Sequence, residues 1–263
     1  MILSSQTIAT ELFEERVHAA AAAGCTGIGL RPKDYTRARE AGLSDDDMRA
    51  LLAGAGVEVV EHQALRDWAS DGGGREAEEE LFAVADALGG DYVIAIASSM
   101  PVVGASVAPR LADLADRAAE HELRVALEFL PWSPVSDAAT AWSLVQAADR
   151  PNLGVLVDAW HLFRGSGDLE QLRAIPGDRV AAVHLADADD EVCGTLLEDT
   201  VSHRRVPGEG SLPLVDFVRA LDEIGVDVDY AVEVLSREQR DLPPDEAARR
   251  AVDGARRVIA SAR

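Results

Sequence analysis

The chain has few basic residues, few cysteines and few aromatic residues. Its 263 residues include 25 lysines and arginines against 47 aspartates and glutamates, which gives a formal net charge of -22. Because this much negative charge repels nucleic acids and anionic membrane surfaces, neither is expected as a partner. The two cysteines, Cys25 and Cys193, lie far apart and form no paired-thiol motif, which argues against a disulfide framework.

Long hydrophobic runs are also missing. No apolar stretch reaches the roughly 18 residues that a membrane-spanning helix needs. The first ten residues, MILSSQTIAT, lack the basic segment and the apolar core of a signal peptide. We therefore expect a soluble, cytoplasmic protein that acts on a small-molecule substrate, and the sequence leaves homo-oligomerisation open.

The chain does contain a regular alternation of short apolar runs with longer amphipathic runs rich in Ala, Glu and Arg. Eight strands alternating with helices predict a parallel α/β sheet. The chain length suits a closed (β/α)8 TIM barrel, formed by a single domain over residues 1–263. The alternative, an open doubly wound sheet, lacks a glycine-rich phosphate loop after the first strand. Strands are expected over 2–5, 27–30, 57–61, 92–97, 125–129, 153–157, 180–185 and 230–235. Helices are expected over 10–23 (with Thr10 as N-cap), from 44 to 56, up to 88, and over 106–122, 136–148, 214–224 and 245–260.

The polar stretch 187–211 shows no clear period. Loops longer than about 12–15 residues in compact domains are mostly functional or disordered. Arg204 and the turn at Pro207 and Gly208 lie within this stretch. We therefore expect it to form a lid that folds over a bound ligand.

Polar side chains end four successive strands in the C-terminal half of the chain. The runs VALEF, VLVD, VAAVH and AVEV carry Glu128, Asp158, His184 and Glu233 at or near their ends. In a parallel barrel the carboxyl ends of all strands meet at one rim, where reactive groups gather. These four side chains are therefore expected to lie together.

Three carboxylates at one place repel one another strongly unless a positive charge lies among them. A divalent cation supplies that charge. Three oxygen ligands and one imidazole favour Mn²⁺ or Mg²⁺, while Co²⁺ and Zn²⁺ also accept such a set. The alternative is that an arginine or a helix N-terminus neutralises each acid separately. Repetition on four successive strands favours the shared cation, with Mn²⁺ as the first choice.

The segments GVLVDAWH, VHLAD, HRRVPGEG and AVEV, preceded by LEF, resemble the sugar phosphate isomerase/epimerase superfamily of xylose isomerase-like TIM barrels. This superfamily includes D-tagatose 3-epimerase-like enzymes, hydroxypyruvate isomerase, inosose dehydratase and 3-dehydroshikimate dehydratase. The resemblance is strongest over residues 125–236. It implies that the metal ligands are Glu128, Asp158, His184 and Glu233.

The resemblance also implies residues that contact the substrate. One is His161, the histidine of the D-x-x-H motif. Another is an arginine four residues before the first glycine of P-G-x-G, which is Arg204 by this count, with Arg205 adjacent to it.

The chemistry follows from such a site. A cation that binds a carbonyl and a neighbouring hydroxyl acidifies the C–H bond between them by stabilising an enediolate. Glu128 and Glu233, on the fifth and eighth strands, suit a catalytic pair that removes and returns the proton from opposite sides. The expected activity is that of an isomerase or epimerase acting on a sugar-like or cyclic α-hydroxy carbonyl compound.

Other functions remain open at this point. Loss of a β-hydroxyl from the same enediolate would make the protein a lyase or dehydratase. A second alternative is a non-catalytic barrel that serves as a binding or partner subunit. An endonuclease IV-type repair enzyme is disfavoured, because the chain has only six histidines for a multi-zinc site and a strongly negative charge.

The segment after LEF departs from the sugar epimerases. Those enzymes usually carry a second glutamate six residues after the first ligand, and this position is Pro134 here. Trp132 and Trp160, together with Phe129 and Phe163, instead predict a pocket with apolar walls. Such a pocket suits a cyclic keto-acid, a glycoside or an aromatic polyol. The alternative is that these aromatic side chains pack the barrel loops.

Two further polar residues are candidate substrate contacts. His62 follows the third expected strand, on the face that would line the pocket, although a structural histidine is equally compatible with that position. Asp187 lies three residues after His184 and could orient a ligand or touch the substrate.

Overall fold

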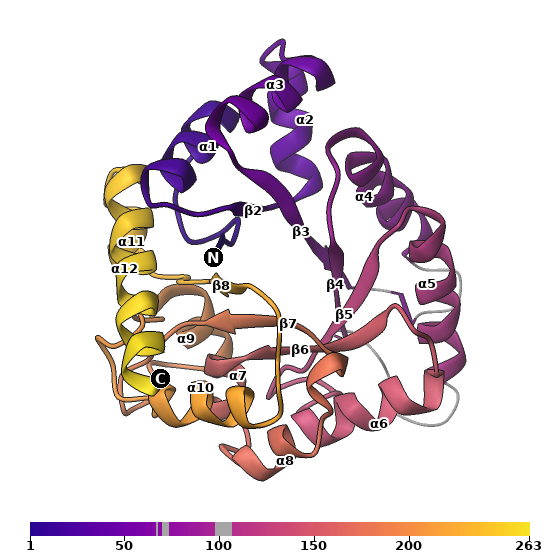
Figure 1. Ribbon diagram of the computed structural model, residues 1–263, viewed down its shortest axis with the longest axis vertical. Coiled ribbons are helices and arrows are strands. Elements are labelled where there is room, and N and C mark those ends of the chain that lie inside the picture. Colours follow the sequence, from indigo (N-terminus) through magenta and orange to yellow (C-terminus); the bar gives the residue numbers. More distant parts are fainter. Residues whose placement is uncertain (67, 70–73, 98–106) are drawn as a thin grey trace.

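The computed structural model describes residues 1–66, 68–69, 74–97 and 107–263. In this part of the chain, eight parallel strands form a closed barrel in which each strand pairs with the next and the last pairs with the first (Figure 1). The predicted TIM barrel is therefore confirmed. The strands are β1 (Ile2–Leu3), β2 (Gly27–Leu30), β3 (Glu58–Leu65), β4 (Tyr92–Ile96), β5 (Arg124–Glu128), β6 (Leu153–Asp158), β7 (Val180–Leu185) and β8 (Tyr230–Val232).

Helices connect successive strands and surround the barrel (Figure 1). They are α1 (Phe13–Ala22), α2 (Pro32–Glu40), α3 (Asp45–Ala55), α4 (Arg75–Leu88), α5 (Ala108–Glu120), α6 (Ala138–Ala148), α7 (Ala159–Arg164), α8 (Leu169–Arg173), α9 (Leu196–Ser202), α10 (Leu214–Glu223), α11 (Arg237–Arg240) and α12 (Pro244–Ala262), with a 3-10 turn, η1 (Gly177–Arg179), before β7. The ring closes where α12 packs against α1 and α10. No helix in the described ranges is both long and apolar enough to cross a membrane.

Local sequence signals set several helix ends. Ser44 caps α3 because its hydroxyl accepts the N–H of Asp47 at 3.1 Å, while the Asp47 carboxylate accepts the N–H of Ser44 at 2.9 Å. Gly56 ends the same helix in a left-handed conformation at φ 65°. The expected N-cap of α1 at Thr10 is wrong. The helix begins later, and the Thr10 hydroxyl donates to Glu15 instead, at 2.6 Å.

The largest differences from the expected elements are short helices. The helices α2, α7, α8 and α11 span between four and nine residues, which is too short to show a full amphipathic repeat. The stretch 187–211, expected to lack regular structure, contains α9, which Thr195 caps. Strand β3 continues beyond the expected range to Leu65. The expected helix start at Ser106 lies outside the described residues.

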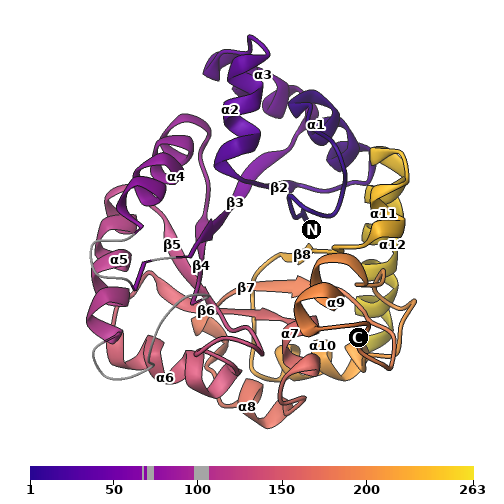
Figure 2. The same cartoon turned by 180° about the vertical axis from the view of Figure 1, so that it is seen from behind.

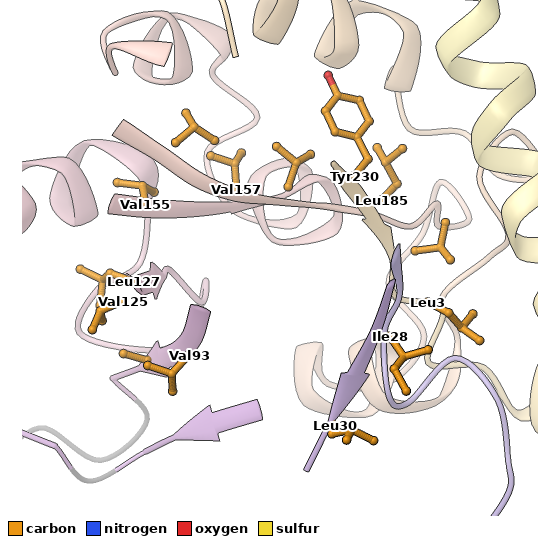
Figure 3. Close-up of a cluster of buried hydrophobic side chains, with 14 of the residues drawn as sticks. Leu3, Ile28, Leu30, Val93, Val125, Leu127, Val155, Val157, Leu185 and Tyr230 are labelled. Atoms are coloured by element: carbon orange, nitrogen blue, oxygen red, sulfur yellow. The ribbon is translucent and has the colours of Figure 1, made fainter. Parts of the chain in front are cut away.

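The strands divide the hydrophobic core into two regions. The larger region lies between the strands and the helices and contains outward-facing side chains of every strand, such as Val93, Val125 and Leu185 (Figure 3). A smaller cluster that includes Ile94 and Leu156 fills the inside of the barrel. Because side chains alternate along a strand, the same strands that pack against the helices also present residues to the barrel interior.

Helix α9 marks the end of the barrel where the site lies. Figure 2 shows α9 in front of β7 and β8. Its residues Leu197, Thr200 and Val201 line a cavity together with Glu128 and Glu233, which end β5 and follow β8. The segment between β7 and α10 therefore covers part of the C-terminal rim.

Candidate active site

Four polar side chains from four successive strands meet at the C-terminal rim. Glu128 ends β5, Asp158 ends β6, His184 lies one residue before the end of β7, and Glu233 directly follows β8. One ligand atom from each lies within 4.8 Å of the others, and all four side chains are buried. The strand register accounts for part of this convergence, because Asp158 of β6 is the direct partner of His184 in β7.

Burial and neighbouring charges shift the pKa values of the three carboxyl groups in different directions. Burial, reinforced by the charge of Glu233, raises the pKa of Glu128 to about 8. Burial also opposes the ionisation of Glu233, but the positive charges of His184 and Arg204 outweigh it and hold that pKa well below its ordinary value. Arg204 likewise lowers the pKa of Asp158 against the effect of burial. The cluster therefore combines a carboxyl group that holds its proton near neutral pH with carboxylates that do not.

A further buried acid, Glu61 in β3, holds His184 from inside the barrel. His184 Nε2 lies 2.7 Å from Glu61 Oε2, and both side chains are at most 1% exposed. The same oxygen accepts the Tyr92 hydroxyl at 2.9 Å. Burial would lower the pKa of His184, but the charges of Glu61 and Glu233 raise it well above its ordinary value. Because Nε2 is bound to Glu61, the nitrogen that faces the cluster is Nδ1, which lies 3.5 Å from Glu233 Oε2.

Sequence reasoning missed Glu61. The available signal was an acid within the apolar run VVEHQAL. A carboxylate buried in a strand is costly unless another element supplies a partner.

Two residues from the first and third strand regions orient Glu233. Its Oε1 accepts a hydrogen bond from Gln63 Nε2 at 2.7 Å and another from the Ser4 hydroxyl at 3.1 Å. Gln63 is itself held by the Ser5 hydroxyl, which donates to its Oε1 at 2.6 Å. These neutral donors favour the ionised form of Glu233, because they bind a carboxylate oxygen that a proton would otherwise occupy.

Arg204 is 2% exposed, and its guanidinium reaches the cluster. Its Nη1 lies 2.7 Å from Asp158 Oδ2 and 3.4 Å from Glu233 Oε2. Its Nη2 lies 3.2 Å from His161 Nε2 and donates to the Thr200 hydroxyl of α9 at 2.8 Å. Burial would lower the pKa of Arg204, but the two carboxylates raise it above its ordinary value. Arg204 therefore connects the segment after β7 to the centre of the site.

Arg205 points away from the cluster. It is bound at the surface by Asp189 at 2.9 Å and by Glu238 at 3.1 Å. Neighbouring residues of an extended segment point to opposite sides, and Arg204 occupies the inward side here. Of the two arginines, Arg204 lines the cavity at the cluster and Arg205 does not, so contact between Arg204 and a substrate stays a prediction.

His161, in the first turn of α7, lies beside both Glu128 and Arg204. Its backbone N–H donates to Asp158 Oδ1 at 3.1 Å, and its Nε2 lies 3.6 Å from Glu128 Oε1. Burial lowers its pKa to about 4, so the imidazole is neutral at pH 7. Because Arg204 can only donate, its contact with His161 makes Nε2 the acceptor and leaves the proton on Nδ1.

A cavity of about 520 Å³ opens at the cluster. Glu128, Glu233, His161 and Arg204 all line it. Trp132, which is 38% exposed, lies in its wall, and contact between this ring and a substrate stays a prediction. The wall includes the apolar residues Ile94, Ile96, Leu130, Leu197, Val201 and Leu235.

Trp160 is fully buried and does not line this cavity, so the expectation that it contacts the substrate is corrected. It packs beside Ala186 and Ala188. The Arg204 guanidinium lies over its ring, with Cζ 5.2 Å from the ring centroid, a cation–π contact. The ring centroid of His161 lies 5.2 Å from that of Trp160. Trp160 therefore supports two cavity residues from behind.

His62 and Asp187 also lie outside the cavity lining, contrary to expectation. The His62 imidazole faces the C-terminal end of α4, where its Nε2 lies 2.8 Å from the Gly89 carbonyl oxygen. The Asp187 carboxylate accepts the backbone N–H groups of Gly208 at 2.9 Å and Gly210 at 3.1 Å. His62 is thus a structural histidine, and Asp187 holds the P-G-x-G turn that follows Arg204.

The cluster has the donor set of a divalent cation site. Glu128 Oε1 and His184 Nδ1 are buried and have no hydrogen-bond partner within the described part of the chain. Carboxylate oxygens and an imidazole nitrogen are ligands that divalent cations accept. The four residues that could hold such an ion are Glu128, Asp158, His184 and Glu233.

Two enzymes of known activity are similar to this chain in sequence. A 3-dehydroshikimate dehydratase of Pseudomonas aeruginosa is 31% identical over 254 residues, which is 93% of this chain and 39% of that protein. The chain thus spans about two fifths of the length of this relative. An inosose isomerase of Bacillus subtilis is 30% identical over 139 residues, which is 52% of this chain and 49% of the isomerase.

Among solved structures, the IOLI protein with a bound zinc atom superposes with a TM-score of 0.87 at 22% identity, covering 98% of this chain and 97% of that one. This similarity shows the shared fold. The model of the xylose isomerase-like TIM barrel family matches residues 17–258. The chain therefore belongs to the xylose isomerase-like TIM barrel family.

Proposed function

We propose that this protein is a divalent-metal-dependent enzyme that removes a proton from the carbon next to the carbonyl group of a hydroxycarbonyl compound. The observation that carries the proposal is the convergence of four ligand atoms within 4.8 Å at a cavity that Arg204 and His161 also line. The zinc atom in the IOLI structure supports a divalent ion. Three carboxylate ligands and one imidazole favour Mn²⁺, with Mg²⁺, Co²⁺ and Zn²⁺ as the other candidates.

The bound cation would polarise the carbonyl group and lower the pKa of the adjacent C–H bond. Glu233 is the base in this proposal, because Ser4 and Gln63 hold its carboxylate in one orientation and favour its ionised form. Glu128 comes from β5, three strands away around the barrel, and approaches from a different side. It is suited to return a proton to the substrate.

Arg204 and His161 act on the substrate oxygens. Arg204 is a buried, permanently charged donor, which suits an oxygen that gains negative charge as the proton leaves. His161 is neutral at pH 7 and carries its proton on Nδ1 when Nε2 accepts from Arg204. Trp132 and the apolar wall exclude water from this reaction.

Two outcomes are open after the proton is removed, and we favour loss of a β-hydroxyl as water. The dehydratase relative aligns with 93% of this chain, and the apolar wall with Trp132 fits a substrate less polar than a free sugar. Return of the proton at another position, as an isomerase or epimerase, is the second candidate. The inosose isomerase relative supports it over 52% of the chain.

The test is a reaction with Mn²⁺ in D₂O, followed by mass spectrometry and NMR. The substrates include 3-dehydroshikimate and 2-keto-myo-inositol, the inosose. Loss of one water supports the dehydratase, and deuterium incorporation without mass loss of water supports the isomerase. Glu233→Gln should lower either rate by about a thousandfold, within the range for removal of a general base. The exposed Glu246→Gln on α12 is the matched control.

If no substrate in the panel exchanges or loses water with the metal-loaded protein, the catalytic proposal fails and a non-catalytic binding barrel becomes the better interpretation. Full activity of Glu233→Gln would remove Glu233 from the role of base.

A further inference from the structure

The cavity has two exposed, positively charged residues in its wall, although the chain as a whole is strongly negative. Lys33, in the first turn of α2, and Arg66, which follows β3, both line it, and both side chains are exposed. Lys33 is the only lysine in the sequence. Because β2 and β3 are paired neighbours, the segments that follow these strands and carry the two cations leave the barrel side by side. Two cations therefore lie at one cavity of a protein with a net charge of -22.

The other two cations of the cavity are already neutralised. Arg31 donates to both carboxylate oxygens of Asp34, at 2.9 and 2.8 Å. Arg204 is bound within the four-residue cluster. Lys33 and Arg66 differ from them, since neither has an ion pair or a side-chain hydrogen bond with another residue in the described part of the chain. Their positive charge is therefore available to a ligand.

Another part of the same cavity is acidic. Glu128 and Glu233 line it, and Asp158 lies beside them. The third acid among the lining residues is the exposed Glu80 of α4, so the lining holds four arginines and lysines against three acids. An anionic group is repelled by these carboxylates and attracted to the two cations. A carbonyl and a hydroxyl group, by contrast, suit the cluster under the proposed function. The cavity thus orients a molecule that carries both kinds of group.

We infer that the substrate carries an anionic group, a carboxylate or a phosphate, that binds Lys33 and Arg66 while its hydroxycarbonyl end lies at the cluster. The position of the hydroxycarbonyl end at the cluster rests on the proposed function. The binding of an anionic group to Lys33 and Arg66 rests on the charges of the cavity alone. Neutral keto-cyclitols fall outside this class, so the inference also predicts which of the two candidate substrates is the better one.

The test uses ligands that do not react. Catechol and 3,4-dihydroxybenzoate carry the same vicinal diol, and only the second has a carboxylate. Calorimetry with the Mn²⁺-loaded protein should show the carboxylate binding about tenfold more tightly, since each exposed cation adds up to about fivefold. 3,4-Dihydroxyphenylphosphonate is the third ligand. A preference for it over the carboxylate would identify phosphate as the natural group.

The double variant Lys33→Met/Arg66→Gln should bind all three diols with equal affinity. Arg257→Gln removes an exposed arginine of α12 that forms no side-chain ion pair among the described residues and lies outside the cavity, and it should keep the tenfold preference. In the unmodified protein, added salt should weaken binding of the carboxylate and leave catechol binding unchanged.

Equal affinity of the unmodified protein for catechol and the carboxylate would overturn the inference. Survival of the preference in the double variant would do the same. Neither measurement depends on turnover. A protein that discriminates the diols but never exchanges a proton in D₂O would therefore refute the proposed function and leave this inference standing.

Discussion

The two halves of the barrel contribute differently to the site. All four members of the cluster lie on β5 to β8 or directly after them. His161 and Arg204 also belong to that half of the chain. The first half, β1 to β4, contributes no member of the cluster among the described residues, yet it provides the groups that hold the cluster in place.

Those supporting groups are Ser4, Glu61 and Gln63, which are 0%, 0% and 6% exposed. Two of them bind Glu233, and the third binds His184. Glu61 and Gln63 reach from β3 across the inside of the barrel, whereas Ser4 reaches Glu233 from the end of the neighbouring strand, because Leu3 of β1 pairs with Val232 of β8. Each partner is more than a hundred positions away in the sequence. A buried polar group is costly without a partner, so the partnership stabilises both halves. The reactive groups are therefore concentrated in one half of the barrel, and buried residues of the other half orient two of them.

The largest expected effect is a loss of metal affinity in Glu61→Gln, which removes the first-half residue that holds His184. Loss of the carboxylate weakens the bond that fixes His184 with Nδ1 toward the cluster. Replacing the partner of a ligating histidine typically lowers metal affinity by about ten- to a hundredfold. Calorimetric titration of the metal-free protein with Zn²⁺ and with Mn²⁺ measures this directly, without reference to catalysis.

Glu78→Gln is the matched control for Glu61→Gln. Glu78 is also a buried acid, and it pairs with Arg117 at 2.7 Å on the outer helical layer. Its replacement should lower the free energy of unfolding and leave metal affinity unchanged. Metal affinity in Glu61→Gln equal to that of the unmodified protein would show that the first half of the barrel does not set the orientation of His184.

Smaller and different effects are expected from replacing the two tryptophans of the second half, Trp160 and Trp132. Trp160→Leu should lower the free energy of unfolding by about 2–3 kcal/mol, because a fully buried ring is lost. It should also lower kcat, because Arg204 loses the ring that supports it. Trp132→Leu removes a partly exposed ring in the cavity wall, so it should raise KM with little loss of stability. Chemical denaturation measures the free energy of unfolding of each variant, and steady-state kinetics measures its kcat and KM.

The opposite pattern, with Trp160→Leu raising KM alone, would restore the sequence-based hypothesis that Trp160 contacts the substrate. The phenylalanine variant Trp160→Phe keeps an aromatic face under Arg204. It should therefore recover part of the kcat that Trp160→Leu loses.

The sequence predicted the barrel and the meeting of the four strand ends because both follow from simple periods. Apolar runs ending in Asp158 and His184 show the strands and their ends directly. The partnership between Glu61 and His184 could not be predicted, since it joins residues 123 positions apart across the barrel. Strand β3 also runs past its expected end at Glu61, which places that acid inside the strand.

The roles of adjacent residues were harder still. Trp160 and His161 differ by one position, but α7 starts directly after Asp158. A helix turns by about 100° per residue, so one ring enters the cavity and the other is buried behind it. Arg204 and Arg205 diverge for the corresponding reason in an extended segment. Which of two adjacent side chains faces the cavity therefore depends on the local backbone conformation and not on the residues that make up a motif.

The smallest expected effect concerns the two cysteines, one in each half. Cys25 is buried between α1 and β2, and burial raises the pKa of its thiol to about 11. It is therefore protonated and shielded at pH 8, whereas Cys193 is exposed in the segment before α9. Iodoacetamide should modify only Cys193 in the folded protein, as peptide mass spectrometry would show.

Activity after this modification should stay within about twofold, because changes to exposed side chains outside a site have small effects, and Cys193 does not line the cavity. Unfolding in guanidinium should make both thiols reactive, which provides the control for reagent and pH. Modification of Cys25 at a similar rate in the folded protein would mean that the packing between α1 and β2 opens readily. In that case the first half of the barrel would not be rigid enough to hold Glu233 and His184 in the way that its buried hydrogen bonds indicate.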